Sequence, residues 1–339
     1  MNAEVSIQAA HGALPCADLP AALDGERVDL GPSGGLCCYV AGRGPPLLLV
    51  HSVNAVPSAA EMRPLFERYR STHTVFAPDL PGFGHSERSD RDYNPRLMTD
   101  ALHRVTALAR NRCGGLPVDG LAVSLGCEFL ARAALERPAS FGRIALVSPT
   151  GLDGRRSRRG PPGSTYARPW LHALLSQTLW AKALYRGLTH PALIRYFLQR
   201  TWGSRAIDET LWAYDVRTAR QPGARHAPLH FIAGSLFSRD IHHVYEALSM
   251  PVWLSHGLHG SFADFRALSQ LTVSSVWRRS VFQTGAMPYF ERPQAFCQAF
   301  DAFLERQSGS AASHLPSAKS PETDPVGPLH PAVYARTAR

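Results

Sequence analysis

Short apolar runs that alternate with helical patterns are the feature that most constrains the fold of this chain. The run Leu-Leu-Leu-Val over 47–50 has no polar position, which is typical of a strand buried on both faces of a parallel sheet. Further strand patterns occur at 35–40, 74–77, 118–123, 144–147, 251–254 and 276–282. Helical patterns lie between several of these runs, and one begins at Pro95 behind the capping residue Asn94. The alternation predicts an α/β fold, with a mostly parallel, doubly wound sheet.

This alternation stops near residue 153 and resumes near residue 246. The intervening stretch is mainly helical and aromatic, so we expect a helical cap over 154–245 and an α/β core formed by 25–153 and 246–306. The weakly patterned residues 1–24 are expected to form an N-terminal extension. The segment 307–339 is rich in Ser, Pro and Ala and is predicted to be a disordered tail.

Composition excludes several classes of protein. No apolar run approaches the roughly 18 residues that a transmembrane helix needs, and the first 20 residues lack the basic start and apolar stretch of a secretory signal. The six cysteines show no CxxC pairing, which predicts reduced thiols in a cytoplasmic protein. We expect neither a metal nor a cofactor, because no metal-ligand spacing and no phosphate-cradling glycine loop is present.

The chain is basic, with 36 Lys and Arg against 27 Asp and Glu. The arginines are dispersed along the sequence, so a nucleic-acid partner is not expected. The one dense run is Arg155, Arg156, Arg158 and Arg159. We interpret it as a solvated loop, with recognition of a carboxylate or phosphate as the alternative.

Ser124 lies between a predicted strand and a predicted helix, in the segment D-G-L-A-V-S-L-G over 119–126. A nucleophile elbow has the pattern G-x-S-x-G in this setting, because small neighbours let the strand and the helix approach each other closely. Here Ala122 stands at the first glycine position and Gly126 at the second. The pattern predicts that Ser124 is a nucleophile.

Two further segments extend this pattern. V-H-S-V-N over 50–54 follows an apolar strand, and D-L-P-G-F-G-H-S over 79–86 follows the next one. With the Ser124 turn, they make the chain resemble the α/β-hydrolase superfamily over about 25–306, in the branch of esterases, epoxide hydrolases and haloalkane dehalogenases. The resemblance implies that Ser124 attacks an acyl carbonyl. It also implies an oxyanion hole formed by the Leu125 N–H and an N–H near Ser52 or Val53.

The chain departs from the superfamily at its other two catalytic positions. In T-G-A-M-P-Y-F-E-R-P over 284–293, Ala286 stands where the resemblance implies a histidine base, and alanine accepts no proton. Gly260 stands where the acid is expected. Asp264 and Asp153 are the alternative acids. His259 is the best-placed replacement base, because its loop neighbours the acid position.

Two functions therefore remain open. The first is an esterase-type serine hydrolase with an incomplete triad, acting on a small or medium apolar ester. The second is a catalytically degenerate member that binds an apolar ligand or a protein partner. His51 at a strand end and the cap aromatics Trp170, Trp180 and Phe197 are the predicted substrate-binding residues.

Overall fold

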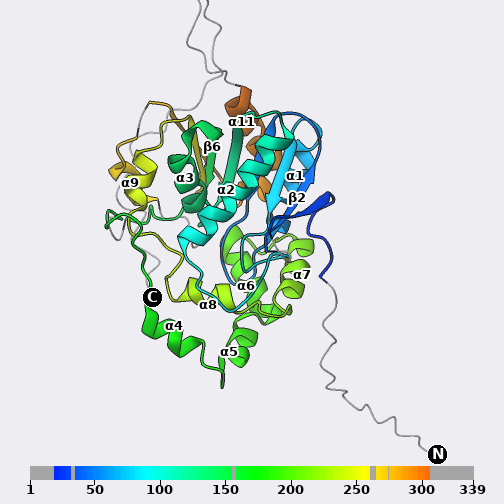
Figure 1. The fold of residues 1–339 in the computed structure, drawn as a ribbon, viewed down its shortest axis with the longest axis vertical. Helices are drawn as coiled ribbons and strands as arrows, with labels where there is room; N and C mark the ends of the chain where they lie inside the picture. The colour runs from blue at the N-terminus through cyan, green and yellow to red at the C-terminus, as the bar shows by residue number, and fades with distance from the viewer. Residues whose placement is uncertain (1–18, 32–34, 155–157, 260–264, 274, 306–339) are drawn as a thin grey trace, which may run out of the picture. The chain divides into compact units, whose positions relative to one another are not determined.

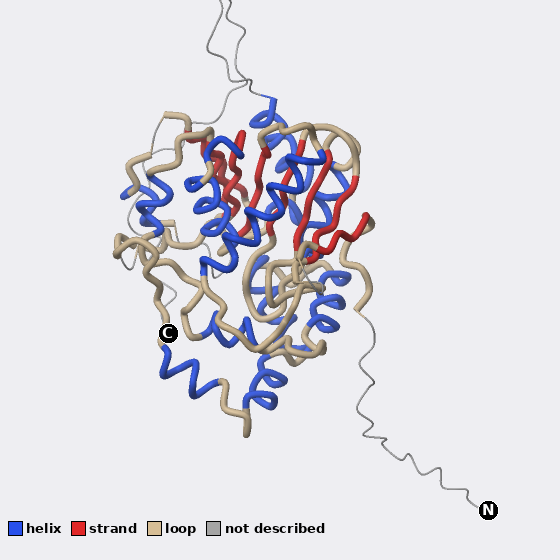
Figure 2. Tube along the Cα trace, viewed as in Figure 1, coloured by secondary structure: helices blue, strands red, loops and turns tan. Residues whose placement is uncertain are grey.

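The computed structural model describes residues 19–31, 35–154, 158–259, 265–273 and 275–305. All of these residues except Glu305 belong to one unit of the chain, Met1–Leu304. Within it, one eight-stranded sheet has the strand order β1-β2-β4-β3-β5-β6-β7-β8, and helices lie against it (Figures 1 and 2). The strands are Glu26–Asp29 (β1), Cys37–Ala41 (β2), Pro46–Val50 (β3), Thr74–Pro78 (β4), Val118–Val123 (β5), Phe141–Val147 (β6), Val252–Gly257 (β7) and Trp277–Phe282 (β8).

The sheet is antiparallel at one edge only. β2 pairs antiparallel with both β1 and β4, and every other neighbouring pair is parallel. β3 and β5 lie side by side in the middle and are buried along their whole length. The predicted α/β fold with a mostly parallel sheet is thus confirmed. Because β3 to β8 run parallel, their carboxyl ends lie at the same edge of the sheet. Open α/β sheets bind their ligands at this edge.

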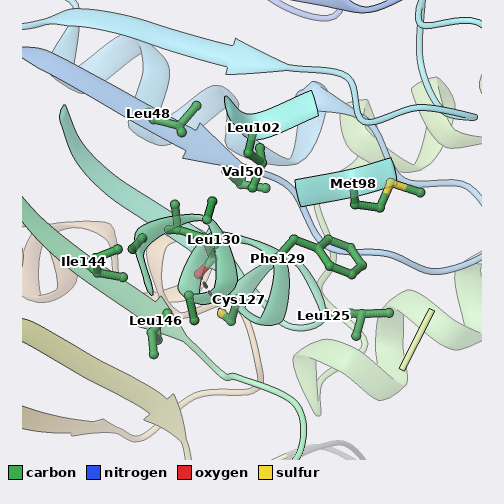
Figure 3. Packing of buried hydrophobic residues seen from close by; sticks show 14 of the residues in the cluster. Leu48, Val50, Met98, Leu102, Leu125, Cys127, Phe129, Leu130, Ile144 and Leu146 are labelled. Atoms are coloured by element: carbon green, nitrogen blue, oxygen red, sulfur yellow. Dashed lines mark hydrogen bonds between the residues drawn. The ribbon is translucent and has the colours of Figure 1, made fainter. Parts of the chain in front are cut away.

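Two groups of helices cover the two faces of the sheet. On one face α2 (Pro95–Arg112) and α3 (Gly126–Glu136) pack on β3 and β5. Figure 3 shows this cluster, in which Leu48 and Val50 of β3 meet Leu102 of α2. On the other face lie α1 (Arg63–Tyr69) and α11 (Pro293–Glu305), with the short helices Ala59–Met62 (η2) and Pro288–Glu291 (α10). The side chains of β3 alternate between the two clusters, as the pleat of a strand requires.

The sequence between β6 and β7 is helical, as its pattern indicated. Its helices are Pro169–Leu175 (α4), Ala181–Leu188 (α5), Pro191–Trp202 (α6), Glu209–Thr218 (α7), His226–Ile232 (α8) and Ile241–Glu246 (α9). α9 packs against α3, with Ile241 and Tyr245 in the core cluster on that face of the sheet. α6 and α7 contribute Ile194 and Leu211 to the cluster on the other face. Two short helices complete the described chain, Pro138–Ser140 (η3) and Arg266–Gln270 (η4).

Several sequence expectations concern residues outside this description. Residues 1–18 and 307–339 are not described, so the predicted extension is described only over 19–24, where Ala22 and Leu23 are buried, and the predicted disordered tail is not tested. Among the described residues, none of the helices combines the length and the apolarity that a bilayer crossing requires. In the same residues no three His, Cys, Asp or Glu side chains gather as a metal site would need.

Candidate active site

Ser124 occupies a strained turn between β5 and α3. Its φ is +54°, a left-handed conformation that costs a residue with a Cβ of order 1 kcal/mol or more. The Ser124 N–H donates to Val147 O at 2.9 Å, and its carbonyl accepts from Cys127 N at 3.1 Å. Gly126 is needed because a Cβ there would lie 2.4 Å from His51 O. The turn therefore has the geometry that the G-x-S-x-G pattern requires, with alanine tolerated at position 122.

Three backbone N–H groups were candidates for an oxyanion hole, and they differ in whether they already have a hydrogen-bond acceptor. The Ser52 N–H donates to Glu61 Oε2 at 2.8 Å, and Ser52 Oγ donates to Oε1 at 2.9 Å. Within the described ranges, neither the Val53 N–H nor the Leu125 N–H has a hydrogen-bond acceptor. Of the two alternatives at 52 and 53, the amide of Val53 is therefore the free one. Val53 and Leu125 are the amides that can bind an oxyanion here.

Glu61 is a feature that the sequence analysis missed. Its side chain lies at the start of the helical segment after β3, is only 2% exposed, and is fixed by Ser52 and Asn54. Burial raises its pKa to about 7, although the hydrogen bonds from Ser52 favour the charged form. A glutamate in an amphipathic stretch gives no sequence signal that it faces inward. Only the structure shows that Glu61 accepts hydrogen bonds from Ser52 in the turn after β3.

His51 is fully buried, and both of its ring nitrogens are hydrogen bonded. Nε2 accepts from the Leu80 N–H at 2.9 Å, so Nδ1 carries the proton and donates to Ser52 O at 2.6 Å. Burial lowers its pKa and keeps the ring neutral. His51 thus connects the 50–54 turn to the 79–86 loop, and neither nitrogen is free to bind a substrate.

The D-L-P-G-F-G-H-S loop is held together by its own aspartate. Asp79 Oδ1 accepts from Ala59 N at 2.7 Å and Oδ2 from His85 N at 2.8 Å. Gly84 has φ +49°, and a Cβ there would lie 1.9 Å from Asp79 Cγ. The loop therefore needs Asp and Gly at these two positions to support the site, and Asp79 is a positioning residue.

The turn at Ala286, where the resemblance implies a base, is hydrogen bonded to the end of β6, the strand next to β5. The Ala286 carbonyl accepts from Ser148 Oγ at 2.8 Å, and the Ala286 N–H donates to Thr201 O of α6 at 2.9 Å. Ala286 is buried and has no group that could accept a proton. Among the described histidines, none has a hydrogen bond to Ser124, so Ser124 has no imidazole base bonded in place.

Neither His259 nor Asp153, the other predicted catalytic residues within the described ranges, has a hydrogen bond to Ser124. His259 is exposed after β7, and its N–H donates to Thr284 O at 2.9 Å. Asp153 Oδ2 lies 3.3 Å from Arg158 Nη2 in an ion pair. Asp264 lies outside the described residues. The predicted substrate-binding aromatics are all exposed large side chains of the cap segment: Trp170, Trp180 and Phe197.

Tyr289 is a second feature without a sequence signal. Its ring is fully buried against Phe290 and Phe296, and its hydroxyl has no hydrogen-bond partner among the described residues. Burial raises its pKa, and the charge of Glu61 raises it further, so the phenol is neutral. A buried hydroxyl without a hydrogen-bond partner is costly.

An open cleft of about 490 Å³ lies away from Ser124. Its exposed lining is more apolar than polar, and none of the predicted site residues lines it. Its lining residues come from the start of α2, from α3 and from the loop after β6: Asn94, Pro95, Arg96, Arg132, Glu136, Gly163 and Thr165.

A serine at a strained turn after β5, free amides beside it and this strand order together define the class of α/β hydrolases. The sequence model of the alpha/beta hydrolase family matches residues 47–299, and the chain belongs to this family.

Individual relatives are more distant. The pimeloyl-[acyl-carrier protein] methyl ester esterase of Xylella fastidiosa is 32% identical over 109 residues, which are 32% of this chain and 38% of that protein. The chain therefore matches well under half the length of this curated relative. The epoxide hydrolase CorEH has a TM-score of 0.63 at 20% identity, over 82% of this chain and 97% of CorEH. The 2-hydroxy-6-oxo-6-phenylhexa-2,4-dienoate hydrolase of Rhodococcus sp. RHA1 has a TM-score of 0.61 at 18% identity, over 82% and 99%. At these identities the solved structures show the fold alone.

Proposed function

We propose that the protein is an esterase-type serine hydrolase in which Ser124 attacks the carbonyl carbon of a small or medium apolar ester. The observation that carries the proposal is the left-handed φ of +54° at a serine, beside the free amides of Val53 and Leu125. A strained residue with a Cβ persists where its position matters, since glycine would fit without that cost. The partial similarity to methyl ester esterases supports the same reaction class.

The proposed reaction follows from these groups. Ser124 Oγ forms a bond to the carbonyl carbon, and the two amides stabilise the negative charge that develops on the carbonyl oxygen. The alkoxide of the ester then leaves, and water hydrolyses the acyl-serine. The hydroxyl proton passes to His259, with Asp264 or Asp153 as its acid, or directly to water. With no imidazole bonded to Ser124, esters of acidic alcohols react fastest, because their leaving groups need no proton.

A second candidate is a ligand-binding protein that has lost catalysis. Ala286 favours it, because the buried turn that would hold a base has only a methyl group there. Under this alternative the strained serine is retained from a catalytic ancestor, and the site binds an apolar ligand or a protein partner.

Labelling with a fluorophosphonate, read by intact mass and peptide mapping, distinguishes the two candidates. A hydrolase forms an adduct on Ser124, and Ser124→Ala abolishes it. Ser148→Ala is the matched control, since Ser148 also has a positive φ and lies at the end of the next strand; this variant keeps the adduct on Ser124. No adduct at high probe excess contradicts the proposed function and leaves the ligand-binding alternative. His259→Ala slows the labelling only if His259 takes the proton.

A further inference from the structure

The excess positive charge of the chain lies in one segment. Residues 154–207 contain ten Lys and Arg and no Asp or Glu, whereas the whole chain has 36 cations and 27 acids. The rest of the chain therefore has 26 cations against 27 acids and is close to neutral. Arg158, Arg159 and Arg195 pair with acids from outside the segment. The cations that remain give the segment a local positive potential, which attracts anionic surfaces.

The same segment exposes large apolar side chains. In α4, Trp170 is 66% exposed and Leu174 is 49% exposed. In the turn between α4 and α5, Leu179 is 87% exposed and Trp180 is 43% exposed. α4 buries none of its residues, and Figure 1 shows α4 and α5 at the margin of the unit, away from the sheet. Single exposed apolar residues are ordinary, but four within eleven positions mark an interaction surface.

α5 shows which side of this segment faces outward. Ala181 and Tyr185 are buried, and Tyr185 Oη donates to Ala55 O at 3.0 Å, which fixes α5 to the turn after Val53. Lys182 and Arg186 lie one turn apart on the exposed side. Neither has an acidic partner among the described residues, so their charges are available to a surface outside the protein.

We propose that α4, α5 and the turn between them dock on an anionic phospholipid membrane. We call this surface, formed by Trp170, Leu174, Leu179, Trp180, Lys182 and Arg186, the α4–α5 surface. Surfaces that combine Trp and Leu with Lys and Arg bind at membrane interfaces. The apolar side chains enter the acyl boundary, while the cations stay at the anionic headgroups. An acidic protein would be attracted by the same charges. It would not by itself account for two tryptophans and two leucines held in water at these exposures.

Sedimentation of the full chain with lipid vesicles tests this proposal. We expect binding to equimolar phosphatidylglycerol and phosphatidylcholine vesicles, weakening as salt is raised, and much weaker binding to pure phosphatidylcholine. The double variant Lys182→Gln, Arg186→Gln should reduce the partition coefficient about 30-fold, because each cation near an anionic surface contributes roughly a factor of five. Trp170→Ser with Leu179→Ser should reduce it at least about tenfold.

The matched control is Arg27→Gln with Arg43→Gln, two exposed arginines near β1 and β2 that change the net charge equally. This variant should bind as the unaltered protein does, and so should Ser124→Ala, which separates docking from the proposed catalysis. The proposal is overturned by no binding to the anionic vesicles, by equal binding to phosphatidylcholine, or by an equal loss in the control. Binding to immobilised polyglutamate without binding to vesicles would assign the surface to an acidic protein instead.

Discussion

Ser148 Oγ donates a hydrogen bond of 2.8 Å to the carbonyl oxygen of Ala286. Ser148 follows β6, and the residue before it, Val147, accepts the Ser124 N–H. The turn at 286 is therefore tied to the strand end next to the nucleophile. At position 286 this turn has only a methyl group, which accepts no proton.

Ala286→His should restore a base to this turn. We expect hydrolysis of p-nitrophenyl acetate to rise about 10²-fold, the lower range for a positioned general base. Steady-state kinetics of the purified variant measure the effect, and Ala286→His with Ser124→Ala should lose the gain. An unchanged rate in a folded variant would contradict the expectation that the oxyanion hole and the acid are intact. Ala286 is buried, so circular dichroism must first show that histidine fits.

The strain at Ser124 predicts a stability difference between two small substitutions. Ser124→Gly should be about 1 kcal/mol more stable than Ser124→Ala, because only glycine adopts a φ of +54° without a Cβ clash. Urea unfolding of both variants measures this difference. At Ser176, where φ is −87°, the order should reverse and alanine should be equal or better. Equal stability of the two Ser124 variants would mean that the turn relaxes when the serine is removed.

The sequence predicted the sheet and the nucleophile turn because both depend on local patterns. The apolar run 47–50 predicts a strand from its own residues alone. The S-x-G motif at 124–126 predicts the turn once a strand is expected before it and a helix after it. The loop at 79–86 could be predicted for the same reason, because Asp79 accepts a hydrogen bond from His85 within the loop.

The surroundings of the site could not be predicted in this way. Glu61 reaches Ser52 and comes within electrostatic range of Tyr289, two residues far apart in the sequence. An amphipathic pattern also does not say which apolar residues stay exposed. Trp170 and Trp180 fit a buried stripe by spacing, yet both are exposed, and α4, which contains Trp170, buries none of its residues.

Tyr185 should contribute to stability through one hydrogen bond. Tyr185→Phe removes the bond from Tyr185 Oη to Ala55 O and should lower the free energy of unfolding by about 1 kcal/mol. Tyr196→Phe is the control, because Tyr196 is half exposed and its hydroxyl has no described partner; it should change stability little. Urea unfolding measures both variants. Equal effects would show that α5 is not held to the 53–55 turn by this contact.

The buried carboxyl of Glu61 predicts how stability depends on pH. Its pKa is raised to about 7 in the folded protein against an ordinary value of 4.5. Between these two values the folded protein keeps a proton that the unfolded chain has released. This group therefore contributes stability that is fully present below pH 4.5 and is lost as pH rises to about 7. The slope it adds is about −1.4 kcal/mol per pH unit inside this window, and it is flat outside it.

Glu61→Gln isolates this contribution, because glutamine keeps the shape and can still accept from the Ser52 N–H. Glu128 also has a pKa raised by burial, but it titrates in both proteins and cancels in the difference. Asp215 does not cancel, because its pKa is raised first by burial and then by the charge of Glu61, so both proteins should also have Asp215→Asn. Free energies of unfolding from urea titrations at pH 5, 6, 7 and 8 would show the unaltered protein losing stability relative to the variant up to about pH 7 and not beyond. A difference that does not change with pH would mean that Glu61 is already ionised in the folded state, with the hydrogen bonds from Ser52 outweighing its burial.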